Sequence, residues 1–440
     1  MDVLASLSII TLLASLGTSS ANVALPALAE AFGSSFQQVQ WVLLAYLLAM
    51  TTLIVIVGRL GDAVGRRRVL LAGLAVFTLG SVLCALAPTL SLLIAARAVQ
   101  GLGAAAMIAL AMALVGETIP KARTGSAMGL LGSMSAIGTA LGPSLGGALL
   151  SAFGWRAIFV VNVPLGLIAF VLAYRSLSAN PVVQATTRAP FDKAGMVLLA
   201  ATLAAYSLAM TSSGAFMLAA LLAGGLFVRI EVRAASPLVR LGLLASATIS
   251  TGFAMSALVT AVVMATLVVG PFYLSGALGL TPLLVGAVMS VGPIVAALAG
   301  VPSGRLVDRF GAEAMTIAGL VAMATGSAAL AVIPASAGVW GYVVPLMAIT
   351  AGYALFQAAN NTAVMTGTSH GERGVIAGLL NLSRNLGLIT GASAMGTVFA
   401  LAGMRATFAA AAVMVVAALA LATRTRAIPT RRQPPAATMD

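Results

Sequence analysis

Apolar runs of about 20 residues recur along the whole chain, separated by short polar stretches. A helix of about 20 residues spans ~30 Å, the thickness of the hydrocarbon core of a bilayer. Only 8% of the residues are charged and 61% are hydrophobic, whereas a soluble domain carries roughly 25% charged residues. Because a soluble fold cannot cover so much apolar surface, the sequence predicts an all-α polytopic membrane protein.

Fourteen of these runs are long enough to cross the membrane as helices. The expected transmembrane helices cover residues 3–25, 39–60, 69–87, 90–115, 124–152, 156–175, 194–212, 215–233, 245–272, 283–303, 314–333, 339–366, 375–401 and 406–423. Most connections between them are only a few residues long, which excludes a sizeable soluble domain. The longest connection, residues 176–193, is polar and holds two prolines, so we expect it to be a linker.

The distribution of basic residues supports this helix count, because cytoplasmic loops of membrane proteins are enriched in Lys and Arg. With both termini in the cytoplasm, nineteen of the 23 Lys and Arg residues lie in or beside cytoplasmic loops or the tail. Arg156 and Arg405 lie outside, and Arg97 and Arg384 lie within spans. We therefore expect a multi-pass protein of a bacterial cytoplasmic (inner) membrane, in which the net charge of +13 orients helices and binds no nucleic acid.

A charged burst occurs twice, as GRLGDAVGRRR at residues 58–68 and as GRLVDRFG at residues 304–311. The first burst follows the second expected span and the second burst follows the tenth. If the seventh and eighth spans are an inserted hairpin, the other twelve helices form two six-helix bundles related by a pseudo-twofold axis, with the same turn at the same place. Repeats of this kind are one plan of secondary transporters. The expected domains are the N-terminal bundle (1–177), a linker and inserted transmembrane hairpin (178–240), the C-terminal bundle (241–424) and a disordered basic cytoplasmic tail (425–440).

The repeated turn supplies candidate gating residues. Glycines allow two helices to turn sharply and approach closely, and an acidic side chain at a helix end can pair with arginines or with another helix N-terminus. Asp62 and Asp308 are therefore candidates to latch the cytoplasmic side in one conformation, whereas a plain loop with orienting arginines is the alternative. The gating candidates of the two copies are Gly58, Asp62, Gly65, Arg66, Gly304, Asp308 and Gly311.

The fifth expected span carries Gly138, Gly142 and Gly146, one every four residues, with Pro143 among them. Such spacing gives a face of small residues that permits close helix contact. Proline removes a backbone hydrogen-bond donor and can bend the span. These four residues are further gating candidates, and static packing is the alternative, which does not exclude gating.

Two arginines, Arg97 and Arg384, lie near the expected membrane centre. A charge at that depth costs at least about 2.5–3.5 kcal/mol on insertion scales. Each arginine should therefore face a wet or polar interior, or be satisfied by carbonyl groups at a helix contact. Amides gather at similar depths and either line a central cavity or hold helices together. The substrate-pathway candidates are Asn22, Tyr46, Arg97, Gln100, Gln357, Asn360, Asn361, Asn381, Arg384 and Asn385.

Motifs across nearly the whole chain resemble those of the major facilitator superfamily. GRLGDAVGRRR (58–68) resembles the signature loop of the family, and RAVQGLG (97–103) resembles its fourth-helix motif. GTALGPSLGG (138–147) resembles the fifth-helix motif of its antiporters. Three further stretches resemble the fourteen-helix drug:proton antiporter branch: NVALP (22–26), WVLLAY (41–46) and WRAIFVVNVP (155–164). The resemblance implies that the glycine face of the fifth span seals the two halves together and is separated during transport.

The chain departs from this branch at one informative position. The branch usually carries an aspartate in a Leu-Asp-Thr run of its first helix, where this chain has Leu16-Gly17-Thr18. All ten acidic residues map to termini, loops or span edges, so no carboxylate is expected near the membrane centre. A cationic drug would meet two buried arginines there, which favours a neutral, zwitterionic or anionic cargo. Proton coupling would then use Asp62, Glu117 or Glu30 at the edges, use the proton of the cargo, or be absent.

These features predict a secondary active transporter that exports small organic compounds or drugs by alternating access, proton-linked although the first-helix carboxylate is missing. The alternatives are an uncoupled or exchange carrier of an anionic or neutral metabolite and, ranked lower, a non-transporting membrane receptor. An enzyme is not expected, because the spans contain no nucleophile–base pair. One cysteine and one histidine exclude a Cys/His metal cluster, so we expect no metal and no cofactor. The expected partners are a small organic substrate, protons where transport is coupled, and the lipid bilayer, with the chain a monomer.

The repeat makes a prediction about topology. In a chain with Cys84→Ala, the single substitutions Asp62→Cys and Asp308→Cys should both react with a membrane-impermeant thiol reagent from the cytoplasmic face. Arg405→Cys, which is predicted outside, should react from the opposite face and serves as the control. Labelling of positions 62 and 308 from different faces would contradict two like-oriented bundles.

Overall fold

The computed structural model describes residues 3–119, 121–177, 193–211, 215–234, 246–366 and 373–426, and the regular elements in these ranges are helices. They are α1 (Val3–Ala31), α2 (Phe36–Val39), α3 (Trp41–Val64), α4 (Arg66–Leu86), α5 (Leu90–Thr118), α6 (Lys121–Phe153), α7 (Ala157–Val160), α8 (Asn162–Ser176), α9 (Lys193–Thr211), α10 (Ala215–Arg233), α11 (Ala247–Phe272), η2 (Tyr273–Ala277), α12 (Pro282–Phe310), α13 (Ala312–Val332), η3 (Ala335–Ala337), α14 (Gly338–Thr366), α15 (Arg373–Thr390), η4 (Gly391–Met395) and α16 (Gly396–Arg426). Most of the expected linker and tail, residues 178–192 and 427–440, lie outside the described residues.

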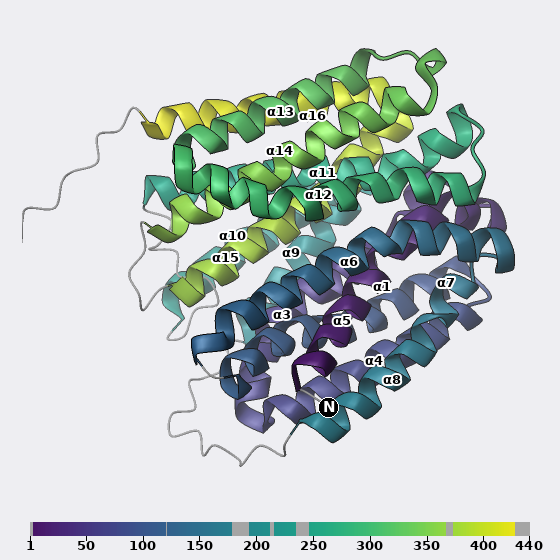
Figure 1. The fold of residues 1–440 in the computed structure, drawn as a ribbon. Helices are drawn as coiled ribbons and strands as arrows, with labels where there is room; N and C mark the ends of the chain where they lie inside the picture. Colours follow the sequence, from purple (N-terminus) through teal and green to yellow (C-terminus); the bar gives the residue numbers. More distant parts are fainter. Residues whose placement is uncertain are drawn as a thin grey trace, which may run out of the picture.

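The helices pack in two groups that follow chain order (Figure 1). In the first group α1 packs against α5, α6 and α8, and α5 packs against α3 and α4. In the second group α11 packs against α14, α15 and α16, and α13 packs against α14 and α16. α6 and α12 run side by side and make the most extensive contact between the two groups.

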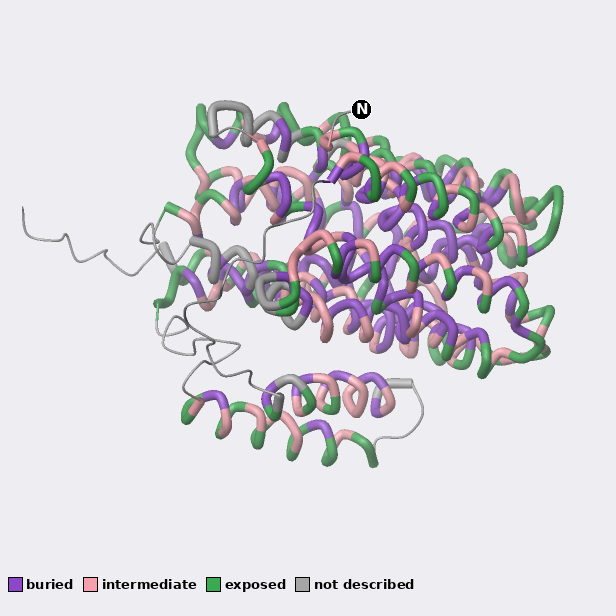
Figure 2. Tube along the Cα trace, turned by 90° about the horizontal axis from the view of Figure 1, so that it is seen from below, coloured by how far each residue is buried: buried purple, intermediate pink, exposed green. Residues whose placement is uncertain are grey.

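Each group has its own buried apolar cluster. Phe77 and Phe159 belong to the first cluster, and Tyr342 and Phe356 belong to the second. Buried residues fill the middle of the main bundle, and exposed residues lie on its outer faces (Figure 2). The first cluster also includes Met264 and three other residues of the second group, so apolar side chains contribute to the contact between the groups.

The α9–α10 hairpin stands apart from the main bundle (Figure 2). α10 packs on α9, and α9 packs on α3 of the first group and on η4 of the second. Outward-facing side chains of α10 such as Leu218, Leu221 and Leu222 are about two-thirds exposed. An apolar helix with this exposure suits a lipid environment.

Both copies of the charged burst end on a glycine with a positive φ. Gly65 (φ 104°) separates α3 from α4, and Gly311 (φ 85°) separates α12 from α13. Side chains with a Cβ are strained at such angles, which explains the glycine. Glycines with positive φ also follow the first helix of each group, at Gly33 and Gly279, and the two turns therefore recur in the same order.

Eleven helical stretches of the described residues are long and apolar enough to cross a membrane, compared with the fourteen predicted. Ile137–Phe153 and Val197–Ala209 are apolar but shorter. Leu379–Arg424 is one continuous stretch, but its backbone is broken at Gly403 (φ 75°), between the two spans that the sequence predicts there. The structure thus supports a polytopic helical protein, and the count of fourteen stays a prediction.

The glycine face of α6 packs differently from what the family resemblance implies. A Cβ built on Gly138 would lie 2.4 Å from the Leu12 carbonyl oxygen, and one on Gly146 would lie 2.9 Å from the Ser20 carbonyl oxygen. These glycines therefore face α1 within their own group and do not seal the two groups together. Successive residues of a helix are rotated by 100° about its axis. The contact between the two groups therefore uses the neighbouring face of α6, where a Cβ on Gly286 of α12 would lie 2.3 Å from the Pro143 carbonyl oxygen.

The contact between α6 and α1 gives a stability prediction. A Cβ on Gly142 would lie 1.8 Å from the Ser19 hydroxyl oxygen and 2.9 Å from the Ser20 backbone nitrogen. Gly142→Ala should therefore lower the free energy of unfolding by about 1–3 kcal/mol, the range for overpacked sites, as measured by thermal unfolding in detergent. Gly300→Ala in α12 is the control, because no atom lies within 4 Å of its built Cβ. Equal stability of the two variants would contradict the packing described.

Candidate functional site

Arg97 in α5 is the largest fully buried side chain among the described residues, with 1% of its surface exposed. Its Nε donates a hydrogen bond to the Val42 carbonyl (3.0 Å), and its Nη1 donates to the Gly17 carbonyl (3.2 Å). Nη1 also donates to Oε1 of Gln100, one turn along the same helix. The guanidinium carbon lies 4.2 Å from the centroid of the Tyr46 ring. Three helices, α1, α3 and α5, thus converge on one cation.

Hydrogen bonds extend this cluster in two directions. Nε2 of Gln100 donates to the hydroxyl of Ser81 in α4 (2.7 Å). On the other side, the Thr18 hydroxyl donates to the Tyr46 hydroxyl (3.0 Å), which in turn donates to the Ala14 carbonyl (3.4 Å). The predicted residues Tyr46, Arg97 and Gln100 therefore lie in one network that links α1, α3, α4 and α5.

No acidic side chain pairs with Arg97 within the described part of the chain, where Arg66 and Glu117 form an ion pair elsewhere. The Nη2 atom of Arg97 is buried and has no hydrogen-bond partner in the same part. Backbone carbonyls and the Tyr46 ring instead stabilise the charge, and a desolvated cation–π contact contributes about 2 kcal/mol. Of the two arrangements predicted for this arginine, the structure shows contact with carbonyl groups at a helix junction, and Nη2 is left unpaired among the described residues.

Position 17 has no space for a side chain. A Cβ built on Gly17 would lie 2.7 Å from Cζ of Phe77 in α4 and 3.1 Å from its Cε2, and Phe77 is fully buried. At the position where the resembled branch usually carries an aspartate, this chain therefore places a glycine carbonyl against Arg97. A phenyl ring fills the adjoining space.

The candidates in the second half do not form one network. Asn360 in α14 is buried and donates to the Gly252 carbonyl of α11 (3.1 Å), so it joins two helices. Asn385 is buried, Gln357, Asn361 and Arg384 are half-buried, and Asn381 is exposed.

Three candidate residues have buried polar atoms that lack a hydrogen-bond partner in the described chain. They are Asn22 (Oδ1) in α1, Gln357 (Oε1) in α14 and Arg384 (Nε) in α15. An unpaired buried polar group costs about 1–3 kcal/mol, so water or a ligand that pairs with it is stabilised there.

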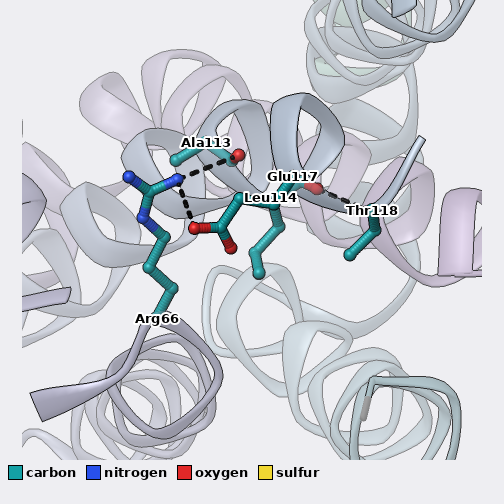
Figure 3. A network of polar contacts seen from close by, with 5 residues as sticks. All are labelled: Arg66, Ala113, Leu114, Glu117 and Thr118. Atoms are coloured by element: carbon teal, nitrogen blue, oxygen red, sulfur yellow. Dashed lines mark hydrogen bonds and ion pairs between the residues drawn. The ribbon is translucent and has the colours of Figure 1, made fainter. Parts of the chain in front are cut away.

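At the Gly65 end of the bundle, where α3, α5 and α12 finish, Arg66 connects α4 to the last turn of α5 (Figure 3). Its Nη1 lies 3.0 Å from Oε1 of Glu117 and donates to the Ala113 carbonyl at 3.2 Å. The two charged side chains are 25% and 43% exposed, so water screens their attraction. The surroundings of the gating candidates Gly58 and Asp62 lie outside what the structure describes.

The second copy of the burst differs from its predicted role. Asp308 is exposed near the end of α12 and forms no ion pair with the other described residues. A Cβ built on Gly304 would meet no atom within 4 Å, so this glycine does not mediate a close helix contact. Phe310, two residues beyond Asp308, is 53% exposed, so this end of α12 is little covered by other described residues. The expected latch at Asp308 is therefore not formed in this structure.

Thr18, Phe77 and Ser81 complete the Arg97 cluster but are not among the candidates predicted from the sequence. They carry no charge and belong to no charged motif, so composition alone does not single them out. The available signal is Gly80, beside Ser81, where a Cβ would lie 2.8 Å from the Gln100 backbone. A glycine in an apolar helix indicates close approach of another backbone, but it does not identify that backbone.

Comparisons with known proteins agree with a transporter. The family model described as Major Facilitator Superfamily matches residues 7–273 and 244–439. The riboflavin transporter RibZ of Clostridioides difficile is 31% identical over 383 residues, which cover 86% of this chain and 84% of that protein. The drug efflux pump JefA of Mycobacterium tuberculosis is 33% identical over 410 residues, which cover 86% of this chain and 76% of that protein.

Solved structures show the same fold at low sequence identity. A bacterial homologue of the human lysosomal transporter Spinster has a TM-score of 0.72 and 17% identity, covering 99% of this chain and 98% of that one. A D-xylose–proton symporter has a TM-score of 0.70 and 15% identity, covering 95% and 96%. These proteins are named as transporters, so the comparisons do not support the receptor alternative, and they indicate solute transport rather than enzyme catalysis.

Proposed function

The chain belongs to the major facilitator superfamily, and we propose that it exports small organic compounds by alternating access, as a fourteen-helix member of the drug:proton antiporter branch. The drug efflux pump among its relatives supports export of such compounds. In this proposal residues 1–177 and 241–424 form the two moving bundles, and residues 178–240 carry the inserted hairpin. The packing of the helices in two groups that meet along α6 and α12 supports this division.

The proposed orientation places Gly65, Gly311 and both termini on the cytoplasmic side of a bacterial inner membrane. The excess of Lys and Arg in the loops at this end of the bundle supports the orientation, because such residues are retained in the cytoplasm. The proposed working unit is a monomer.

The observation that carries the proposal on cargo is a buried Arg97 without an acidic partner in the described residues. Arg384 is also half-buried in the second half. A cationic compound between two such charges would be repelled in a medium of low dielectric constant. The cargo is therefore neutral, zwitterionic or anionic, and a riboflavin transporter among the relatives fits an uncharged aromatic cargo.

Proton coupling in this proposal uses Glu117 at the membrane edge, because Gly17 leaves the middle of α1 without a carboxylate. Protonation of Glu117 would remove its charge and weaken its ion pair with Arg66, which joins α4 to α5. A second candidate function is an uncoupled exchange carrier of an anionic or neutral metabolite. The absence of a carboxylate beside Arg97 in the described chain favours it.

Ligand binding tests the proposed cargo. Purified protein is heated with riboflavin, with the anionic dye fluorescein and with the lipophilic cation ethidium at equal concentrations. A ligand at 100 times its Kd stabilises the folded state by about 2.7 kcal/mol, so riboflavin or fluorescein should raise Tm by several degrees and ethidium should not. Stabilisation by ethidium alone would contradict the proposed cargo class.

Transport in proteoliposomes tests the coupling. An imposed pH gradient should drive uptake of the stabilising ligand several-fold above exchange without a gradient, and Glu117→Gln should abolish that increase while exchange continues. Glu313→Gln, at the corresponding corner of the second half, is the matched control and should keep the increase. Wild-type uptake that is indifferent to the pH gradient would exclude the coupled mechanism and support the exchange carrier.

A further inference from the structure

Three phenylalanines from the two groups meet at the Gly154 end of the bundle, where α1, α6 and α11 finish. Phe36 comes from α2 in the first group, and Phe272 and Phe399 come from α11 and α16 in the second. The ring centroid of Phe36 lies 4.6 Å from that of Phe272, at an interplanar angle of 71°, and 5.1 Å from that of Phe399, at 57°. The rings of Phe272 and Phe399 lie 6.3 Å apart. One ring of the first group is thus held by two rings of the second.

Gln40, one turn after Phe36, is fully buried at the junction of α2 and α3. A Cβ built on Gly396 of α16 would overlap its Nε2 atom, so the second group covers this amide. Its Oε1 and Nε2 both lack hydrogen-bond partners in the described chain. The amide therefore loses its water when the groups meet and gains no partner in exchange, which opposes closure.

We propose that Phe36, Phe272 and Phe399 form the gate that closes the Gly154 end, and that Gln40 opposes its closure. The inference rests on the alternating access proposed above. Contact among the three rings favours the closed end, because aromatic pairs attract beyond the area that they bury. Hydration of the Gln40 amide favours the open end. The two opposed contributions lie within one turn of helix, so they keep the gate reversible.

The chain offers a matched control for each gate residue. Phe32 lies four residues before Phe36, and its ring centroid lies 5.3 Å from that of Trp155, within the first group. Its replacement removes an aromatic contact from the same end of the molecule without touching the described contact between groups. Gln37 is half-buried and serves as the control for the fully buried Gln40.

The experiment measures the opening of this end directly. In a Cys84→Ala chain reconstituted in nanodiscs, spin labels are attached at Phe153→Cys and Leu401→Cys. These positions belong to different groups and are 77% and 80% exposed. Pulsed electron paramagnetic resonance then gives the ratio of short to long distances. Phe36→Ala should lower this ratio about tenfold, the effect of losing two aromatic pairs, and Gln40→Leu should raise it several-fold. Phe32→Ala and Gln37→Leu should change it less than twofold.

The outcomes separate the gate from the proposed function. One outcome is two distance populations whose ratio in Phe36→Ala, Phe399→Ala and Gln40→Leu equals that of the Cys84→Ala background. This result would overturn the gate and leave alternating access intact. A shift in Phe32→Ala as large as that in Phe36→Ala would also overturn it, because general packing would then explain both. A single distance that neither variants nor ligand change would overturn alternating access itself. If Phe36→Ala does not fold, Gln40→Leu still decides, because it removes an unpaired amide and should favour the closed end.

Discussion

Close contact between helix backbones at glycine is the interaction on which the rest of this structure depends. In lipid, helices gain little from burying apolar surface, so short backbone contacts and polar bonds hold them together. At Gly101 a Cβ would lie 2.4 Å from the Tyr46 carbonyl oxygen, and at Gly387 one would lie 2.3 Å from the Ala257 carbonyl oxygen. The first contact brings α3 and α5 near enough for Arg97 to reach a backbone carbonyl of α3. The buried polar cluster therefore depends on the glycine beside it.

The buried arginine in turn is the basis of the proposed cargo class. Val42 and Gly17 offer carbonyl dipoles to Arg97 rather than a full negative charge, and Phe77 fills the space that a side chain at position 17 would need. Among the described residues, the N-terminal half thus holds its buried charge with dipoles and not with an acidic side chain. This arrangement fits a carrier whose proton linkage, cargo selection and gate use different residues.

Much of the fold follows from the sequence, because lipid requires long apolar helices and short turns between them. The repeated burst predicted two corresponding corners, and Gly65 and Gly311 both have a positive φ there. Periodicity also identified the small-residue face of α6, but it could not show that Gly142 meets α1 rather than α12, because a smooth face fits many helices. The latch at Asp308 is not formed in this structure and stays a prediction, since a motif fixes a turn and not what lies opposite it. Gln40 was missed because its unpaired amide is visible only once the second group covers it.

The position of the α9–α10 hairpin has a consequence for how the two groups meet the bilayer. The hairpin lies against α3 of one group and η4 of the other, so it shields the line along which these two elements meet from the acyl chains. Along the α6–α12 line the two helices contact each other directly, as at Gly286 and Pro143. The two lines along which the groups meet are therefore kept from the lipid by different means, one by an inserted hairpin and the other by glycine packing.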